Sequence, residues 1–112
     1  MALEVKIREK KEVTVIQLSG RVIGVDGEKF SKKLDATYWK KKKKLVLDLS
    51  EVTFLDSHGL GTIVYYFHSM QKENRQLIIL NANPDPNTYV KRLFDLTNLN
   101  KILTIVDSIE QA

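Results

Sequence analysis

The sequence predicts a single α/β domain over residues 1–112, with a mixed, largely parallel β-sheet packed against helices. A chain of 112 residues has the length of one domain and can bury a hydrophobic core without disulfides or metal. Short β-rich segments alternate along it with segments of helical periodicity. Strands that are separated by helices need crossover connections, and these make neighbouring strands parallel.

The first two strands are expected to form a hairpin at the edge of this sheet. Apolar and charged residues alternate over residues 3–8, as in a half-exposed strand. Residues 13–19 are a second β-rich run, and the polar residues 9–12 between the two runs suit the turn of a hairpin. Because the two strands of a hairpin are antiparallel, the predicted sheet is mixed.

A first helix is predicted after a loop at residues 20–27, which contains three glycines. Asp26 is the expected N-cap, because its side chain can accept a hydrogen bond from a backbone N–H at the helix start. The apolar residues of this helix recur every four positions and therefore lie on one face: Phe30, Leu34 and Tyr38.

The middle of the chain repeats the strand–helix pattern. Residues 45–49 and 77–80 are short apolar runs, as expected of strands that are covered on both faces. Residues 50–55 are predicted to connect the first of these strands to a helix that begins at Asp56 or Ser57. One stripe of that helix is expected to be buried: Leu60, Ile63, Val64 and Phe67.

A third helix and a last strand complete the predicted fold. Residues 81–87 contain Pro84 and Pro86 and are expected to form a loop. The helix that follows turns three residues inward: Val90, Leu93 and Phe94. Residues 103–106 are the last strand, so the predicted order is β-β-α-β-α-β-α-β.

The composition excludes several classes of protein. The chain has no cysteine, which excludes a disulfide framework, a thiolate zinc site and a cysteine nucleophile. No apolar run approaches the roughly 18 residues of a membrane span. Residues 1–11 alternate apolar and charged side chains and do not resemble a secretory signal. We therefore expect a cytoplasmic protein without a membrane span.

The net charge of +4 is unevenly distributed, because residues 1–50 carry +6 and residues 51–112 carry −2. The excess comes mainly from the run Lys40–Lys44, which follows Tyr38 and Trp39. One interpretation is a solvated helix end, where lysines complement the negative pole of the helix dipole. The other is a nucleic-acid surface, which needs base-reading residues among the basic ones. Since no recognition motif accompanies the run, we favour the first and expect no nucleic-acid partner.

Asp, Ser and His stand in succession at residues 56–58, which at first suggests a hydrolase. However, neighbouring residues on a helix point in different directions and cannot form a nucleophile–base chain. A nucleophile elbow also needs a glycine two positions before the serine, where this chain has Leu55. His68 lies about three turns further along the same helix, too far to act as the base. We therefore predict no catalytic residue and no enzymatic activity.

No cofactor or metal site is predicted either. Gly59-Leu60-Gly61 resembles half of a dinucleotide fingerprint, but Val64 occupies the position of the third glycine. The chain contains no phosphate-binding Gly-x-x-x-x-Gly-Lys sequence. His58 and His68 have no carboxylate at the spacing of metal ligands.

Ser57 has two interpretations, one structural and one functional. In the first, Asp56 and Ser57 are simply good N-cap residues. In the second, Ser57 is a phosphate acceptor, because the unpaired N–H groups at a helix start bind anions. A phosphate there would add about −1.5 to −2 charges without disturbing the fold. Gly59 and Gly61 would keep the first turn slim, so that a partner can approach the backbone.

The segment around Ser57 resembles the signature of STAS domains. The resemblance is carried by Asp48-Leu49-Ser50, Val52, Phe54-Leu55-Asp56-Ser57 and Gly59-Leu60-Gly61. The likeness is to the stand-alone bacterial anti-sigma factor antagonists and extends over almost the whole chain. It implies a STAS-type fold and a function in partner switching.

In that mechanism, the unmodified antagonist captures an anti-sigma factor that is also a serine kinase, and the capture frees a sigma factor. The kinase uses ATP to phosphorylate the motif serine, here Ser57, and a metal-dependent serine/threonine phosphatase reverses the modification. Asp56 would orient the hydroxyl or help to place the magnesium of the kinase. The resemblance implies these partner-binding residues: Ile23, Gly24, Asp26, Asp56, Ser57, His58, Leu60 and Gly61.

One position departs from the family pattern. Members commonly have an acidic residue three positions after the glycine that ends the second strand, here Gly20, and this chain has Ile23. We expect Ile23 to pack under the loop, with a partner contact as the alternative. Two other functions also stay open. The first is a STAS component of a stress-sensing or lipid- or anion-transport complex without a phospho-switch. The second is a small-nucleotide binder or weak nucleotidase, which the anion-binding helix start suggests.

Overall fold

Strands and helices alternate along residues 2–112, the residues that the computed structural model describes. The strands are β1 (Glu4–Glu9), β2 (Val13–Val22), β3 (Lys44–Leu55), β4 (Gln76–Leu80) and β5 (Thr104–Val106). The α-helices are α1 (Gly24–Tyr38), α2 (Ser57–Lys72) and α3 (Tyr89–Leu96). Short 3₁₀ helices follow at Leu99–Lys101 and Ile109–Gln111.

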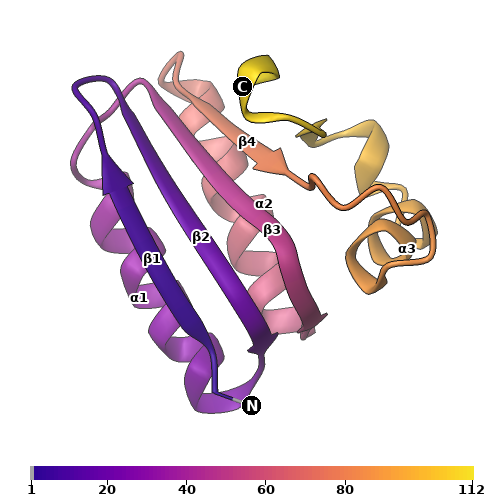
Figure 1. Ribbon diagram of the computed structural model, residues 1–112. Helices are drawn as coiled ribbons and strands as arrows, with labels where there is room; N and C mark the ends of the chain where they lie inside the picture. The colour runs from indigo at the N-terminus through magenta and orange to yellow at the C-terminus, as the bar shows by residue number, and fades with distance from the viewer. Residues whose placement is uncertain (1) are drawn as a thin grey trace.

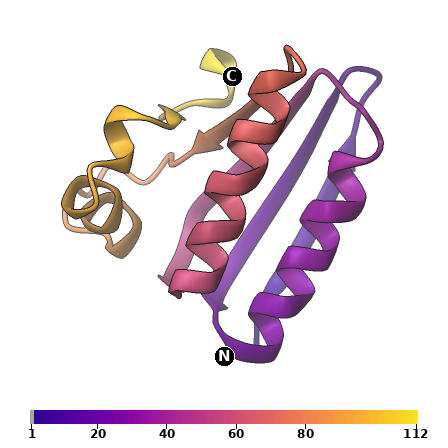
Figure 2. The same ribbon diagram turned by 180° about the vertical axis from the view of Figure 1, so that it is seen from behind.

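The strands form one five-stranded sheet in the order β1-β2-β3-β4-β5 (Figure 1). The edge strand β1 is antiparallel to β2, whereas β2 to β5 are parallel to one another. The crossover connections place α1 and α2 side by side on one face of the sheet (Figure 2). Helix α3 lies on the β4–β5 side of the molecule (Figure 1). This topology confirms the predicted mixed, largely parallel sheet and its N-terminal hairpin.

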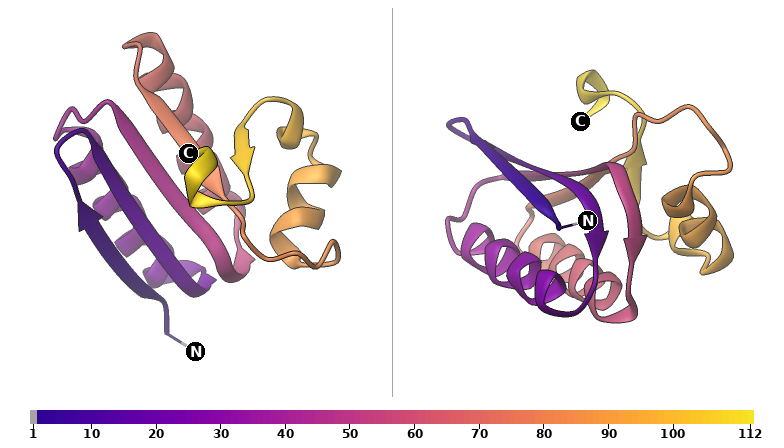
Figure 3. Two further views of the ribbon diagram at one scale, coloured as in Figure 1. Left: turned by 45° about the horizontal axis from the view of Figure 1, so that its top comes forward. Right: turned by 60° about the horizontal axis from the view of Figure 1, so that its bottom comes forward.

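The main core lies between the sheet and the pair α1 and α2. Successive strand residues face opposite sides of the sheet, so alternate residues enter this core. Its fully buried side chains come from both layers: Ile16, Leu18, Phe30, Leu34, Leu47, Leu49, Ile63, Met70 and Ile79. On the opposite face, Val15, Val46 and Leu80 form a smaller cluster, against which Ala112 packs. Figure 3 shows that the C-terminus lies on the side of the sheet away from α1 and α2. Nζ of Lys44 donates to the main-chain oxygen of Ala112 at 2.7 Å and holds the C-terminal segment on this face.

Strands β2 and β3 extend further than predicted. Residues 50–55 were expected to form a connection, but they continue β3 and pair with β2 up to Val22 and Leu55. The extended strand is stable because Val52 and Leu55 are buried in the main core while the backbone stays paired. Irregularities in the register between Gln17 and Arg21 accommodate the extra length. As a result, β2 and β3 end side by side.

The predicted start of the first helix is wrong. Ile23 occupies the N-cap position of α1, and Asp26 lies in the first turn. Gly24 adopts a φ of +60°, which lets the chain turn from strand to helix before Asp26 is reached. The carboxylate of Asp26 instead accepts a hydrogen bond from the N–H of Leu3, at 3.4 Å.

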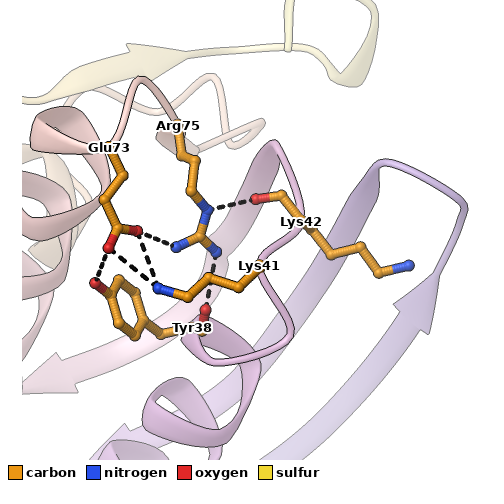
Figure 4. A network of polar contacts seen from close by, with 5 residues as sticks. All are labelled: Tyr38, Lys41, Lys42, Glu73 and Arg75. Carbon is orange, nitrogen blue, oxygen red and sulfur yellow. Dashed lines mark hydrogen bonds and ion pairs between the residues drawn. The ribbon is translucent and has the colours of Figure 1, made fainter.

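Arg75 lies where the parallel strands β3 and β4 begin, and it joins the turn after α1 to the turn after α2 (Figure 4). The residue is 9% exposed, and its side chain donates to the carbonyl oxygens of Lys42 at 2.7 Å and Tyr38 at 2.9 Å. It also pairs with Glu73 at 2.7 Å. The Glu73 carboxylate accepts two further hydrogen bonds, from the Tyr38 hydroxyl at 2.8 Å and from Nζ of Lys41 at 3.1 Å. One carboxylate therefore balances the cationic groups that fix these turns.

This network predicts a specific dependence of stability on pH. Hydrogen bonds from Arg75, Tyr38 and Lys41 lower the pKa of Glu73 from 4.5 to about 2. A carboxyl group whose pKa is lower in the folded state stabilises the fold above pH 4.5, and this contribution is lost as the pH falls towards 2. We expect Glu73→Gln to be less stable than the wild type at neutral pH, with the difference shrinking below pH 4.5.

Urea unfolding at a series of pH values measures this difference. Glu28→Gln is the matched control, because Glu28 is exposed on α1 and makes no ion pair within residues 2–112. A difference between Glu73→Gln and wild type that stays constant from neutral to acid pH would contradict the assignment.

Candidate functional site

The two segments that contain most of the predicted partner-binding residues meet where β2 and β3 end, in the lower part of Figure 1. One is the β2–α1 turn, with Ile23 and Gly24, and the other is the β3–α2 turn, with Asp56 and Ser57. In sheets of parallel strands, this carboxyl-terminal edge is where binding sites commonly form.

Asp56 holds the two turns together. As the N-cap of α2, it accepts a hydrogen bond from the N–H of Gly59 at 2.8 Å through Oδ1, which confirms the predicted helix start. Its Oδ2 accepts from the N–H of Gly24 at 3.3 Å, across to the other turn. Its own N–H donates to the carbonyl oxygen of Val22 at 3.1 Å. Both carboxylate oxygens are therefore engaged with backbone groups.

Ser57 is the first residue of α2, and its side chain is exposed. Within residues 2–112 its hydroxyl makes no hydrogen bond to another residue, and His58 turns towards α1, where its Nε2 lies 3.3 Å from Oγ of Ser31. The hydroxyl is thus accessible to an incoming group. The N–H groups at the start of a helix carry partial positive charge, which favours an anion at this position.

Gly59 and Gly61 have different roles, contrary to the expectation that both keep the surface slim. A Cβ atom on Gly59 would lie 2.8 Å from Cδ1 of Leu55 and 3.1 Å from Cγ1 of Val22. Gly59 is therefore required by packing beneath the turn. A Cβ on Gly61 would meet no atom within 4 Å, and the residue is exposed. Only Gly61 leaves space on the outer surface.

An open hollow of about 440 Å³ lies beside Ser57, between α1 and α2. The residues that line it are Ser31, Ser57, His58, Gly61, Thr62, Tyr65 and Tyr66. Ser31 on α1 joins the two helices, since its Oγ lies 3.2 Å from Oγ1 of Thr62. Burial and a hydrogen bond to Asp35 raise the pKa of Tyr66, so its hydroxyl stays a neutral donor. Ser31, Thr62 and the two tyrosines were not predicted from the sequence, because only the packing of α1 on α2 places them here.

The other residues that were predicted to bind a partner differ in how exposed they are. Ile23 is 39% exposed, which disagrees with packing under the loop, and the neighbouring Val25 is 71% exposed. Asp26 is half-buried and its carboxylate faces Leu3. Leu60 is half-buried against the main core. The exposed surface around Ser57 is therefore formed by Ile23, Gly24, Val25, His58 and Gly61.

Residues 2–112 were also considered as a metal site and as a membrane span. No group of three or more His, Asp or Glu side chains is arranged to hold a metal ion in this part of the chain. Among the helices described, none is long and apolar enough to cross a bilayer.

The two glycines provide a matched test of the local packing. We expect Gly59→Ala to lower the free energy of unfolding by about 1–3 kcal/mol, because the added methyl group crowds Leu55 and Val22. Gly61→Ala should raise it by about 0.5–1 kcal/mol, since alanine is the better helix former and has space here. Urea denaturation of both variants measures the contrast, and similar effects at the two positions would show that Gly59 is not a packing requirement.

Comparison with known proteins agrees with this architecture. The anti-sigma F factor antagonist of Paenibacillus polymyxa is 26% identical over 109 residues, which cover 96% of this chain and 90% of the relative. An anti-sigma factor antagonist from Mycobacterium paratuberculosis has the same fold, with a TM-score of 0.84 at 23% identity over 98% of this chain and 90% of that chain.

SpoIIAA, an anti-sigma factor antagonist and Bacillus cell fate determinant, has been solved in unphosphorylated and phosphorylated forms. The TM-scores are 0.75 and 0.70, both at 18% identity over 96% of this chain, and they cover 91% and 95% of the SpoIIAA chains. The family model of the STAS domain matches residues 4–112. Since that match spans nearly the whole sequence, the chain belongs to the STAS domain family.

Proposed function

We propose that this protein is an anti-sigma factor antagonist, a cytoplasmic regulatory binding protein and not an enzyme. Its relatives carry that name, including the anti-sigma F factor antagonist at 26% identity and an anti-sigma-B factor antagonist of Listeria monocytogenes at 27% identity. The surface around Ser57 captures an anti-sigma factor that is also a serine kinase. The capture releases a sigma factor for transcription.

The switch of this interaction is phosphorylation of Ser57 by the captured kinase, reversed by a serine/threonine phosphatase. The observation that carries this proposal is the exposed hydroxyl at the first position of α2, which makes no hydrogen bond within the described part of the chain. A phosphate there lies beside the N–H groups of a helix start, which stabilise negative charge. The two forms of SpoIIAA provide a precedent for phosphorylation of a protein with this fold.

Asp56 binds the N–H groups of both turns, an arrangement that we call the Asp56 clamp. The clamp supports a switch that acts at the surface and leaves the fold intact. The carboxylate of Asp56 is bound to the N–H groups of Gly24 and Gly59, so it is occupied before any phosphate arrives. The modified serine then changes the charge of the contact surface without breaking either turn. A partner that fits closely over Ser57 would have to bury that charge without a counter-ion.

A second candidate is a STAS component of a larger complex without a phospho-switch. The observation in its favour is Ile23, which stands where members of the family commonly have an acidic residue. Ile23 is 39% exposed, so it lies on the surface that a kinase would contact. In this alternative, Ser57 serves only to begin α2.

The proposal is tested through Ser57 itself. The natural partner is first captured from lysate with wild-type protein and with Ser57→Asp, and identified by mass spectrometry. The purified kinase and ATP should then place one phosphate, on Ser57. Phosphorylation or Ser57→Asp should weaken binding by roughly two orders of magnitude or more, since an uncompensated buried charge costs several kcal/mol. Calorimetry measures the affinity.

Ser57→Ala is the matched control and should bind the partner but resist the kinase. The melting temperature of the phosphorylated form should stay close to that of the unmodified protein. A phosphate on another residue would overturn the assignment of the switch to Ser57. A form phosphorylated at Ser57 that binds as tightly as the unmodified one would favour the second candidate.

Gly61 provides an independent test of the contact surface. We expect Gly61→Leu to reduce partner affinity by about tenfold or more while the fold stays intact, because the new side chain would project from the exposed side of α2. Thermal melting measures the fold, and calorimetry measures the affinity of the same preparation. Unchanged affinity in a folded variant would place the partner elsewhere.

A further inference from the structure

The end of the molecule opposite Ser57 carries a strong positive charge. Three turns meet there. With the strand or helix residues next to them they span residues 9–12, 39–44 and 72–75, and we call these residues together the basic end. They contain nine Lys or Arg residues and three Glu, a net charge of +6. Since the whole chain has a net charge of +4, the remainder of the molecule carries −2.

Hydrogen bonds from side chains to backbone oxygens hold the three turns together in one surface. Nζ of Lys42 donates to the carbonyl oxygens of Lys10 at 2.6 Å and Lys11 at 3.0 Å, and Arg75 donates to the carbonyl oxygen of Lys42. The turns lie together at the top of the view in Figure 1. Four exposed lysines of this end make no ion pair within residues 2–112: Lys10, Lys11, Lys43 and Lys72.

An exposed aromatic side chain accompanies these charges. Trp39 follows the last residue of α1 and is 64% exposed, although tryptophan is usually largely buried. Nζ of Lys41 lies 4.7 Å from the centroid of the Trp39 ring and 4.7 Å from that of Tyr38.

We propose that the basic end docks on an anionic lipid surface, with Trp39 at the level of the headgroups. Clustered lysines are attracted to acidic leaflets, each contributing about fivefold in affinity. Tryptophan is enriched at membrane–water interfaces because its ring is apolar and its N–H is polar. The basic end is distant from Ser57, so docking on a lipid surface does not depend on phosphorylation of Ser57.

Several features favour a lipid surface over nucleic acid. Eight of the nine basic residues are lysines, which act as point charges, whereas recognition of phosphates and bases in nucleic acids relies strongly on arginine. The one arginine, Arg75, is buried and uses its donors on protein groups. The lysine amine over Trp39 and Tyr38 occupies ring faces on which bases would stack.

The orientation that follows leaves the candidate site accessible. Strand β3 runs from the basic end at Lys44 to Leu55, next to Asp56. A molecule that stands on its basic end therefore presents Ser57 away from the lipid surface. Docking on the membrane and binding of a protein partner at Ser57 do not compete for the same face.

Vesicle binding tests the proposal. The protein is mixed with vesicles of phosphatidylglycerol and phosphatidylcholine, or with vesicles of phosphatidylcholine alone, and separated by flotation. Binding should require the anionic lipid and weaken with added salt. Trp39 is the only tryptophan, so its fluorescence should shift to the blue on binding.

Replacing Lys10, Lys11 and Lys43 by Gln should reduce the partition onto anionic vesicles by about a hundredfold. The matched control replaces the exposed α1 residues Lys29, Lys32 and Lys33 by Gln, which changes the net charge equally. The control should keep most of the binding. Thermal melting checks that both variants fold.

Three results would overturn the proposal. The first is no binding of the wild-type protein to anionic vesicles. The second is an equal loss in both triple variants, which would show that net charge alone is responsible. The third is binding to a single-stranded oligonucleotide that is tighter than binding to the vesicles, which would make the basic end a nucleic-acid surface.

Discussion

The parallel arrangement of β2, β3 and β4 places the β3–α2 turn with Ser57 far from the two helix-to-strand turns of the basic end. In such a sheet all strand-to-helix turns lie at the carboxyl ends of the strands, and all helix-to-strand turns lie at their amino ends. Strand β3 therefore separates Ser57 from Lys40–Lys44 by its full length of 12 residues. At physiological salt, exposed charges further apart than about 8 Å are largely screened from one another. A phosphate on Ser57 would not be neutralised by those lysines, so its charge would act on whatever contacts the site.

The site itself depends on a single carboxylate. Asp56 begins α2 by binding the N–H of Gly59, and it fixes the start of α1 by binding the N–H of Gly24. This double role explains why Gly59 has no side chain, because the turn is drawn tightly over Val22 and Leu55. Ser57 follows immediately and takes no part in the clamp. A modified serine therefore changes the surface, whereas loss of the carboxylate would release both turns.

The sequence predicted most of the fold because its elements are set by neighbours in the chain. The alternation in the first strand, the apolar run at 45–49 and the Asp56 cap depend on a few adjacent residues. The continuation of β3 through residues 50–55 could not be predicted in this way, since it depends on pairing with the extended end of β2. The left-handed turn at Gly24 and the Arg75 network likewise depend on segments that are distant in sequence. For the same reason, the hollow between α1 and α2 was not predicted.

Ile23 affects how strongly phosphorylation of Ser57 would change the affinity for the partner. The hydrogen bond between Gly24 and Asp56 brings its turn beside Ser57, and Ile23 and Val25 are both exposed there. An acidic residue at position 23 would repel a phosphate and would also keep the surface hydrated. An apolar residue removes the repulsion and offers the partner an apolar contact. Burying a dianion beside that contact then costs more, because no water remains to solvate it. In a protein that is phosphorylated at Ser57, the exposed Ile23 would thus enlarge the loss of binding that follows the modification.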